Sequence, residues 1–326
     1  MSYSDDDLNQ AVEAGVLSKK DAEGFRHFIT SRRGETASSE EHFRLITGFN
    51  DIFVAIALLL VLVASWYLGD MVSTEIGALT CGLVSWGLAE YFTRIRRMAL
   101  PSIQLLVSFI TAAFFVIPVS DPFEGSILQP LAALAATGLH WWRFRVPITI
   151  AAAMASAVLL IIILIVESGV EIDDPAFVWV VMGLGIITLA KAIWWDSRNP
   201  LRTTRHADVA FWLHMLSAVL IVHPLFSQLS ETDTTTGVVI VLAVYSVLSI
   251  LSIILDRRAL MVAALGYALY ATSNVFIQAG NDDLAYALSG MVIGGGLLML
   301  SAFWVHARRQ VMRFLPEAVL DRLPPA

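Results

Sequence analysis

The lysine and arginine residues of this chain, except Lys191 near the end of one run, fall in alternate segments between long apolar runs. The 326 residues contain ten such runs, each near the length of roughly 20 residues that a helix needs to cross the hydrocarbon of a bilayer. Of the 21 basic residues, 20 lie before the first run or after every second one, and Lys191 lies near the end of the sixth run, whereas the other connections carry only acidic charges. We place the runs at about residues 51–69, 72–93, 101–119, 126–142, 147–167, 176–195, 209–229, 236–255, 259–279 and 284–305.

This sorting of charge predicts a topology. Short loops rich in Lys and Arg stay on the cytoplasmic side of a membrane, so the sequence predicts ten spans with both termini in the cytoplasm. Removing one run from the middle would place basic loops on both sides. Ten spans are therefore favoured over eight or nine.

Composition and backbone chemistry predict the fold class. The chain is 57% hydrophobic and 15% charged, against about 45–50% and 25% in soluble domains. Because lipid offers no hydrogen bonds to a bare backbone, each run must be helical. We expect an all-α polytopic bundle in a lipid bilayer over residues 51–305. The single cysteine, Cys81, excludes an intramolecular disulfide.

Three further segments surround the predicted spans. Residues 1–36 are predicted to form a cytoplasmic helical hairpin, in which Gly15 ends the first helix and Ser18, followed by Asp21, caps the second. A unit this small rarely folds alone, so we expect it to bind a protein partner or a second copy, or to dock on the membrane domain. Residues 37–50 read as a link and a helix leading into the first span, and residues 306–326 as a basic amphipathic cytoplasmic tail.

Two stretches of the sequence carry a resemblance. Residues 8–22, with the sequence LNQAVEAGVLSKKDA, and residues 43–54, FRLITGFNDIFV, resemble a group of bacterial multi-pass membrane proteins of unknown function that begin with a short helical hairpin. The resemblance covers mainly residues 8–62. It implies a bacterial inner-membrane location and brings no functional residues with it.

The last predicted hairpin is similar to that of the ten-helix drug/metabolite transporters. Residues 280–283, GNDD, are followed there by the glycine-rich residues 290–298. In that type the equivalent turn recurs five helices earlier on the opposite side. Here the closest echo, residues 171–174, lies four helices earlier on the same side, which departs from the inverted repeat.

Motifs of soluble catalysis are absent from the sequence, which has no Gly-x-Gly-x-x-Gly, Walker A or His-Glu-x-x-His pattern. No Asp or Glu falls near the middle of a predicted span, and Glu90 near a cytoplasmic end is explained by snorkelling or a local ion pair. Asp196, His206 and Asp208 fit no metal or acid–base spacing, and His214 is expected at the interface. We therefore expect a non-enzyme with no catalytic residue, no metal, no cofactor and no nucleic-acid partner.

Polar residues and prolines in the outer half of several spans are the remaining site candidates. They could line a cavity open to the periplasm, with the prolines kinking their helices. Hydrogen bonds between neighbouring helices, worth about 0.6 kcal/mol on average in one measured case, explain them equally. The cavity candidates are His223, Ser273, Asn274 and Gln129, and the kink candidates are Pro130 and Pro224.

Aromatic and small residues have structural explanations. Paired tryptophans beside basic residues are typical of interfacial anchors; they are Trp141, Trp142, Trp194 and Trp195. Small residues four apart allow close helix packing; examples are Gly77, Cys81 and Ser85, and Gly290 with Gly294.

Two functions are compatible with these observations. The first is a non-enzymatic membrane scaffold or interaction protein whose hairpin, residues 1–36, binds a partner. The alternative is a small-molecule transporter or exporter with a polar cavity in the outer half of the membrane.

Overall fold

A computed structural model gives the fold of the chain. It describes residues 8, 10–12, 14–25, 49–118, 126–171, 175–198, 205–230, 235–278 and 284–315. Two compact units are present, one of Met1–Phe43 with Pro325–Ala326 and one of Arg44–Pro324. The predictions for residues 26–48 and 316–326 lie outside the described residues.

Helices account for the regular structure of the described residues, among which there is no strand. Each of the ten predicted apolar runs overlaps with a helix, and the all-α prediction is confirmed. Five helices, Phe49–Asp70, Ile148–Glu167, Ala176–Ser197, Arg205–Phe226 and Ala285–Ala302, are long and apolar enough to cross a membrane. The helices are α3 (Phe49–Asp70), α4 (Thr74–Ala89), α5 (Ala99–Phe115), α6 (Leu128–Phe144), α7 (Ile148–Glu167), α8 (Pro175–Ser197), α9 (Arg205–Ser230), α10 (Thr235–Leu255), α11 (Ala259–Gln278), α12 (Ala285–Ala302) and α13 (Trp304–Met312).

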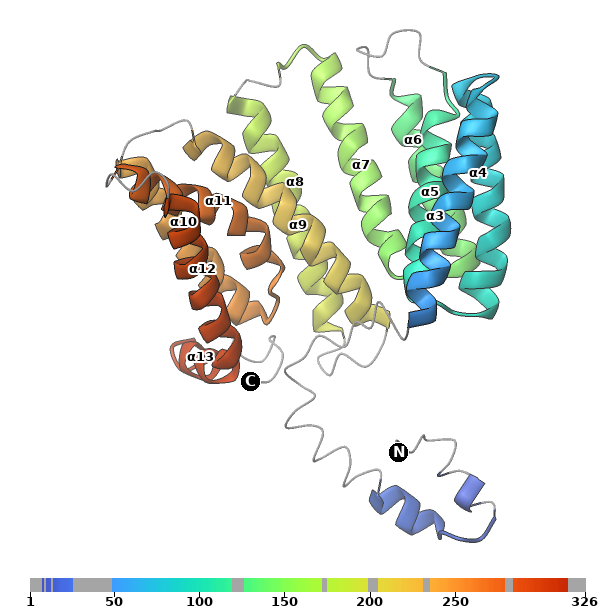
Figure 1. Cartoon of the computed structure of the whole chain (residues 1–326), viewed down its shortest axis with the longest axis horizontal. Coiled ribbons are helices and arrows are strands. Elements are labelled where there is room, and N and C mark those ends of the chain that lie inside the picture. Colours follow the sequence, from blue (N-terminus) through green and yellow to red (C-terminus); the bar gives the residue numbers. More distant parts are fainter. Residues whose placement is uncertain are drawn as a thin grey trace. The chain divides into compact units, whose positions relative to one another are not determined.

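Helices adjacent in sequence are mostly adjacent in space within the larger unit (Figure 1). The helices α3, α4 and α5 pack on one another, α5 packs on α6, and α6 on α7. A second group follows, in which α9 packs on both α8 and α11, and α11 on α10 and α12. The contact between α7 and α9 joins the two groups.

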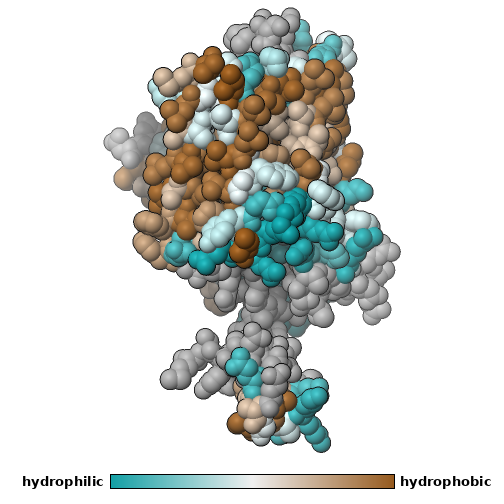
Figure 2. Space-filling model, turned by 90° about the vertical axis from the view of Figure 1, so that its right-hand side faces the viewer, coloured by the Kyte–Doolittle hydropathy of each residue, from teal (hydrophilic) through white to brown (hydrophobic). Residues whose placement is uncertain are grey.

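Apolar side chains cover much of the outer surface of this unit. Leu60 on α3 is 67% exposed and Leu83 on α4 is 66% exposed. Figure 2 shows a broad apolar surface on the α3–α4 side and a hydrophilic band below it. Exposed apolar patches of this extent are unstable in water, so the apolar helices indicate a membrane protein.

Three turns between antiparallel helices contain a left-handed residue that is not glycine. Arg97 lies between α4 and α5, Arg145 between α6 and α7, and Asp256 between α10 and α11, each with φ of 53°. A left-handed residue reverses the chain directly after a helix. A short π-helix, Glu90–Ile95, precedes the first of these turns.

The boundary of the last span differs from its prediction. The sequence predicts one span over residues 284–305, but α12 ends at Ala302 and α13 begins at Trp304. Phe303, with φ of −106° and ψ of 16°, interrupts the helix. The indole Nε1 of Trp304 donates to Asp256 Oδ1 at 2.9 Å, and this contact fixes α13 on the end of α10 rather than in line with α12.

The described part of the N-terminal unit confirms both predicted helix ends. Gly15 has φ of +72°, and the amide of Val16 donates to the carbonyl of Ala11, which is the hydrogen bond of a Schellman motif. Ser18 Oγ accepts from the amide of Asp21 at 3.1 Å and donates to the Asp21 carboxylate at 2.6 Å. These bonds satisfy backbone groups at the junction of the two helices.

Glycine allows α3 and α4 to approach each other closely. A Cβ on Gly77 would lie 2.8 Å from the carbonyl oxygen of Trp66, and one on Gly69 would lie 2.7 Å from Gly77 Cα. Thr80 Oγ1 donates across this contact to the carbonyl of Ser65 at 2.9 Å. The predicted close packing at Gly77 is therefore confirmed.

The glycine pair on α12, Gly290 and Gly294, does not lie at a close helix contact. A Cβ at Gly290 or at Gly294 would meet no atom within 4 Å. The prediction of close packing at these glycines is wrong for the described part of the chain, because four-residue spacing alone does not say which face of α12 meets a neighbour.

We expect Gly77→Ala to lower the stability of the membrane domain by about 1–3 kcal/mol, because the added methyl group overpacks the α3–α4 contact. Gly87→Ala, in the same helix but with no atom within 4 Å of the new Cβ, is the matched control and should be neutral or slightly stabilising. Thermal unfolding of both variants in detergent measures the difference. Equal midpoints would contradict the packing argument.

Candidate functional site

Asp196, at the cytoplasmic end predicted for α8, is the centre of a buried ion pair. Arg257 Nη2 donates to Asp196 Oδ1 at 2.6 Å, and Arg257 Nε donates to Oδ2 at 3.1 Å. The Asp196 side chain is only 10% exposed, and the Arg257 side chain is only 4% exposed. This two-point geometry matches the planar guanidinium to the carboxylate and makes the hydrogen bonds strong.

His214, two to three turns into α9, completes this group. Its Nε2 lies 3.1 Å from Asp196 Oδ2, and its side chain is 2% exposed. Because an ionised carboxylate only accepts hydrogen bonds, Nε2 is the donor. His214 is therefore a buried partner of Asp196, near the predicted cytoplasmic end of α9.

The turn between α10 and α11 carries Arg257 to this position. Asp256 adopts the left-handed conformation, which Asp tolerates better than most residues. The amide of Arg257 then donates to the carbonyl of Ser252 at 3.0 Å, and Ser252 Oγ donates back to the carbonyl of Arg257 at 2.5 Å. The backbone on both sides of the arginine is thus fixed by bonds to α10.

The two neighbours of Arg257 bind α13. Asp256 accepts from Trp304 Nε1 at 2.9 Å and pairs with Arg308 Nη1 at 3.4 Å. The Arg258 guanidinium lies 4.9 Å from the centre of the Trp304 ring, within the range of a cation–π interaction. The turn of residues 256–258, which we call the charged turn, therefore links α8, α9 and α13.

Each acidic side chain of this cluster is paired with an arginine. Asp196 faces Arg257 and Asp256 faces Arg308, and buried charges survive only when paired in this way. The described residues contain no group of three or more His, Cys, Asp or Glu that could hold a metal ion. The arrangement can fix the positions of α8, α9, α13 and the charged turn relative to one another.

A similar ion pair joins the ends of α4 and α6 in the first helix group. Arg143 on α6 donates from Nε and Nη2 to Glu90 at 2.7 and 2.8 Å, and Arg94 Nη1 lies 3.3 Å from the same carboxylate. Glu90 is 33% exposed. The local ion pair suggested for Glu90 is confirmed.

Three of the four predicted cavity residues have different hydrogen-bond partners. His223 Nδ1 lies 2.5 Å from the hydroxyl of Tyr267 on α11, and Ser273 Oγ donates to Ser289 Oγ on α12 at 3.1 Å. Asn274, next to Ser273, is half-buried. Gln129 Nε2 donates to the carbonyl of Ile117 at 3.4 Å. The first three lie in the α9–α11–α12 region, whereas Gln129 belongs to α6, which packs on α5 and α7.

The two prolines occupy different positions in their helices. Pro130 is the third residue of α6, where the missing amide has no partner within the helix in any case, so no kink is required. Pro224 lies inside α9, which continues to Ser230.

The four tryptophans also divide into two kinds. Trp142 is 73% exposed and Trp194 is 43% exposed, and the Arg198 guanidinium lies 3.6 Å from the Trp194 ring centre. Trp141 and Trp195 pack instead against the core cluster of Ala151, Ala192, Val209 and Leu213. Only the first two have the exposure expected of anchors.

Sequence reasoning missed the links from Asp196 to His214 and Arg257. The signal that could have found them is the presence of isolated acids, Asp196 and Asp256, among the basic residues at the predicted cytoplasmic ends. His140 was also passed over. It is 1% exposed among the rings of Trp86, Phe109 and Phe144.

We expect Asp196→Asn and Arg257→Gln each to destabilise the fold by about 3–5 kcal/mol, because each leaves the other charge buried without its counter-ion. The double variant should cost less than the sum of the two single variants. Thermal unfolding in detergent measures all three, with the exposed Arg309→Gln as the control for loss of a basic residue. Additive effects would show that the two side chains do not interact.

Comparisons of this chain with family models, with curated proteins and with solved structures find no match. The candidate site therefore rests on its own geometry.

Proposed function

We propose that this chain is a non-enzymatic protein of the bacterial inner membrane that presents a partner-binding helical hairpin at the cytoplasmic face. Ten spans with both termini in the cytoplasm form the membrane anchor of this proposal. Its support is the separate N-terminal unit, whose helix junction is closed by its own hydrogen bonds.

The hairpin offers apolar side chains for binding. Val16 is 76% exposed and Phe25 is 42% exposed, whereas Ala22 between them in sequence is 1% exposed. A unit of this size cannot bury all its apolar surface. A protein partner or a second copy that covers Val16 and Phe25 would remove that surface from water.

The charged turn suits an anchor that holds its shape. Asp196, Arg257 and Asp256 tie three helices to α13 through buried pairs, and a buried pair is costly to open because each partner must be left uncompensated. A scaffold needs one stable arrangement rather than two interconverting ones.

A photo-crosslinking amino acid at position 16 of the full chain should give a discrete protein adduct in bacterial cells, because Val16 would lie in the interface. The same amino acid at Lys20, an exposed polar position in the second helix, is the matched control. Phe25→Asp should remove the adduct at position 16 by placing a charge in an apolar contact. Equal adducts from positions 16 and 20, or an adduct that survives Phe25→Asp, would refute the proposed interface.

A small-molecule transporter is the second candidate, and the His223–Tyr267 pair supports it. The two side chains are 2.5 Å apart, and His223 is exposed on a helix apolar enough to cross a membrane. Polar groups at such positions usually face a water-filled path or a protein neighbour rather than lipid.

Thiol accessibility distinguishes a water-filled path from lipid. In a Cys81→Ala parent, we expect His223→Cys to react with a membrane-impermeant maleimide in vesicles if a path exists, since only a hydrated thiol ionises. Val219→Cys, one turn away on α9 and 56% exposed, should remain unlabelled in lipid. Absence of labelling at position 223 would remove the support for a transport path.

A further inference from the structure

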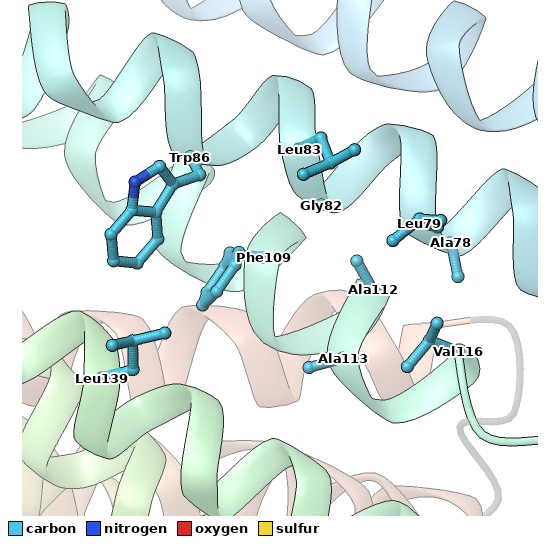
Figure 3. Close-up of a pocket in the computed structure, with 10 residues that line it drawn as sticks. All are labelled: Ala78, Leu79, Gly82, Leu83, Trp86, Phe109, Ala112, Ala113, Val116 and Leu139. Atoms are coloured by element: carbon cyan, nitrogen blue, oxygen red, sulfur yellow. The ribbon is translucent and has the colours of Figure 1, made fainter.

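An apolar groove lies between α4, α5 and α6 (Figure 3). Its volume is about 240 Å³, and the residues that line it are all apolar. Leu83 and Trp86 come from α4, Phe109 from α5 and Leu139 from α6. Figure 3 shows Trp86, Phe109 and Leu139 gathered at one end of the groove.

The groove extends along α4. Its α4 side runs from Ala78 to Trp86, which is about 12 Å at the rise of an α-helix. The close approach of α4 and α5 at Gly82, where a Cβ would lie 3.2 Å from that of Ala112, forms one wall. Typical small-molecule pockets hold about 300–1,000 Å³, so this groove fits a slender apolar chain better than a compact ligand.

The sides of the groove are open. Leu79 is 51% exposed, Leu83 is 66% exposed and Leu139 is 48% exposed. A ligand can therefore enter laterally along the apolar surface of the helices, without a passage from water.

Positive charge lies beyond one end of the groove. Trp86 and Leu139 each precede a member of the Glu90–Arg143 ion pair by one helical turn. Glu90 is neutralised by this pair. The exposed arginines nearby in sequence are Arg94, which also contacts Glu90, and Arg96, Arg97 and Arg145. No described acid other than Glu90 lies on the two segments 86–97 and 139–145.

We propose that this groove, hereafter the acyl groove, binds one acyl chain of an anionic phospholipid whose headgroup lies among these arginines. The apolar lining selects the chain, and the guanidinium groups select the phosphate, which they bind with strong, directional hydrogen bonds. The site is independent of the hairpin and would stand if the hairpin bound no partner.

The test uses the full chain in vesicles of phosphatidylcholine doped with a phospholipid that carries a diazirine in the middle of one acyl chain. Two probes are compared, one with a phosphatidylglycerol headgroup and one with a phosphatidylcholine headgroup. After illumination, peptide mapping should locate the phosphatidylglycerol adducts chiefly in residues 78–86 and 109–116.

Two variants separate the parts of the site. Ala113→Phe fills the acyl groove and should lower the adduct yield there several-fold, whereas Ala287→Phe, the same change on the exposed face of α12, should leave it unchanged. Arg94→Gln with Arg96→Gln should lower the yield of the anionic probe by up to about 25-fold, at about fivefold per basic residue. The corresponding change at Arg309 of α13 and at Arg313, directly after it, should not do so.

Adducts spread evenly over the apolar surface, or equal yields from the two headgroups, would overturn the proposal. The same holds if Ala287→Phe reduces the groove adducts as much as Ala113→Phe. If a variant is misfolded, its thermal unfolding in detergent shows this, and the headgroup comparison on the unaltered chain still decides the question.

Discussion

Apolar surroundings cannot hydrogen-bond to a peptide backbone, and this one constraint shapes the membrane unit. Every long apolar segment of the described chain is helical, because a helix satisfies its own amides and carbonyls. Side chains then face the same constraint. Thr80 donates to Ser65 O, and Ser273 donates to Ser289, so these hydroxyl groups find partners on the next helix rather than in solvent.

The same constraint concentrates ionic contacts at the helix ends. Asp196, Arg257 and Glu90 lie at or beside the ends of α8, α10 and α4. There an ion pair can join two helices without placing a charge among apolar side chains in the middle of a span. The charged turn adds a third link, because Asp256 holds Trp304 and Arg308 of α13. The ends of the helices therefore carry these ionic contacts, and the segments between the ends carry apolar packing and hydroxyl hydrogen bonds.

The helices could be predicted from sequence because each depends on its own apolar run. The α12–α13 boundary could not, since Phe303 breaks the helix where Trp304 bonds to Asp256, a residue 48 positions earlier. The pairing of His214 with Asp196 was missed for the same reason, because Asp196 lies 18 residues away in the preceding helix. The sequence predicted that Gln129 and His223 line one cavity. Whether two residues meet in this way depends on how whole helices pack, which hydropathy does not encode.

Two of the three left-handed turn residues combine an unfavourable backbone conformation with a positive charge. Arg97 and Arg145 adopt φ of 53°, a conformation that costs an L-residue roughly 1–2 kcal/mol and costs glycine little. Glycine at these positions would relax the turn but would delete a positive charge, and positive charge is what retains a loop on the side where it is synthesised. Arginine at these two turns therefore keeps a positive charge in the loop at the expense of an unfavourable backbone conformation.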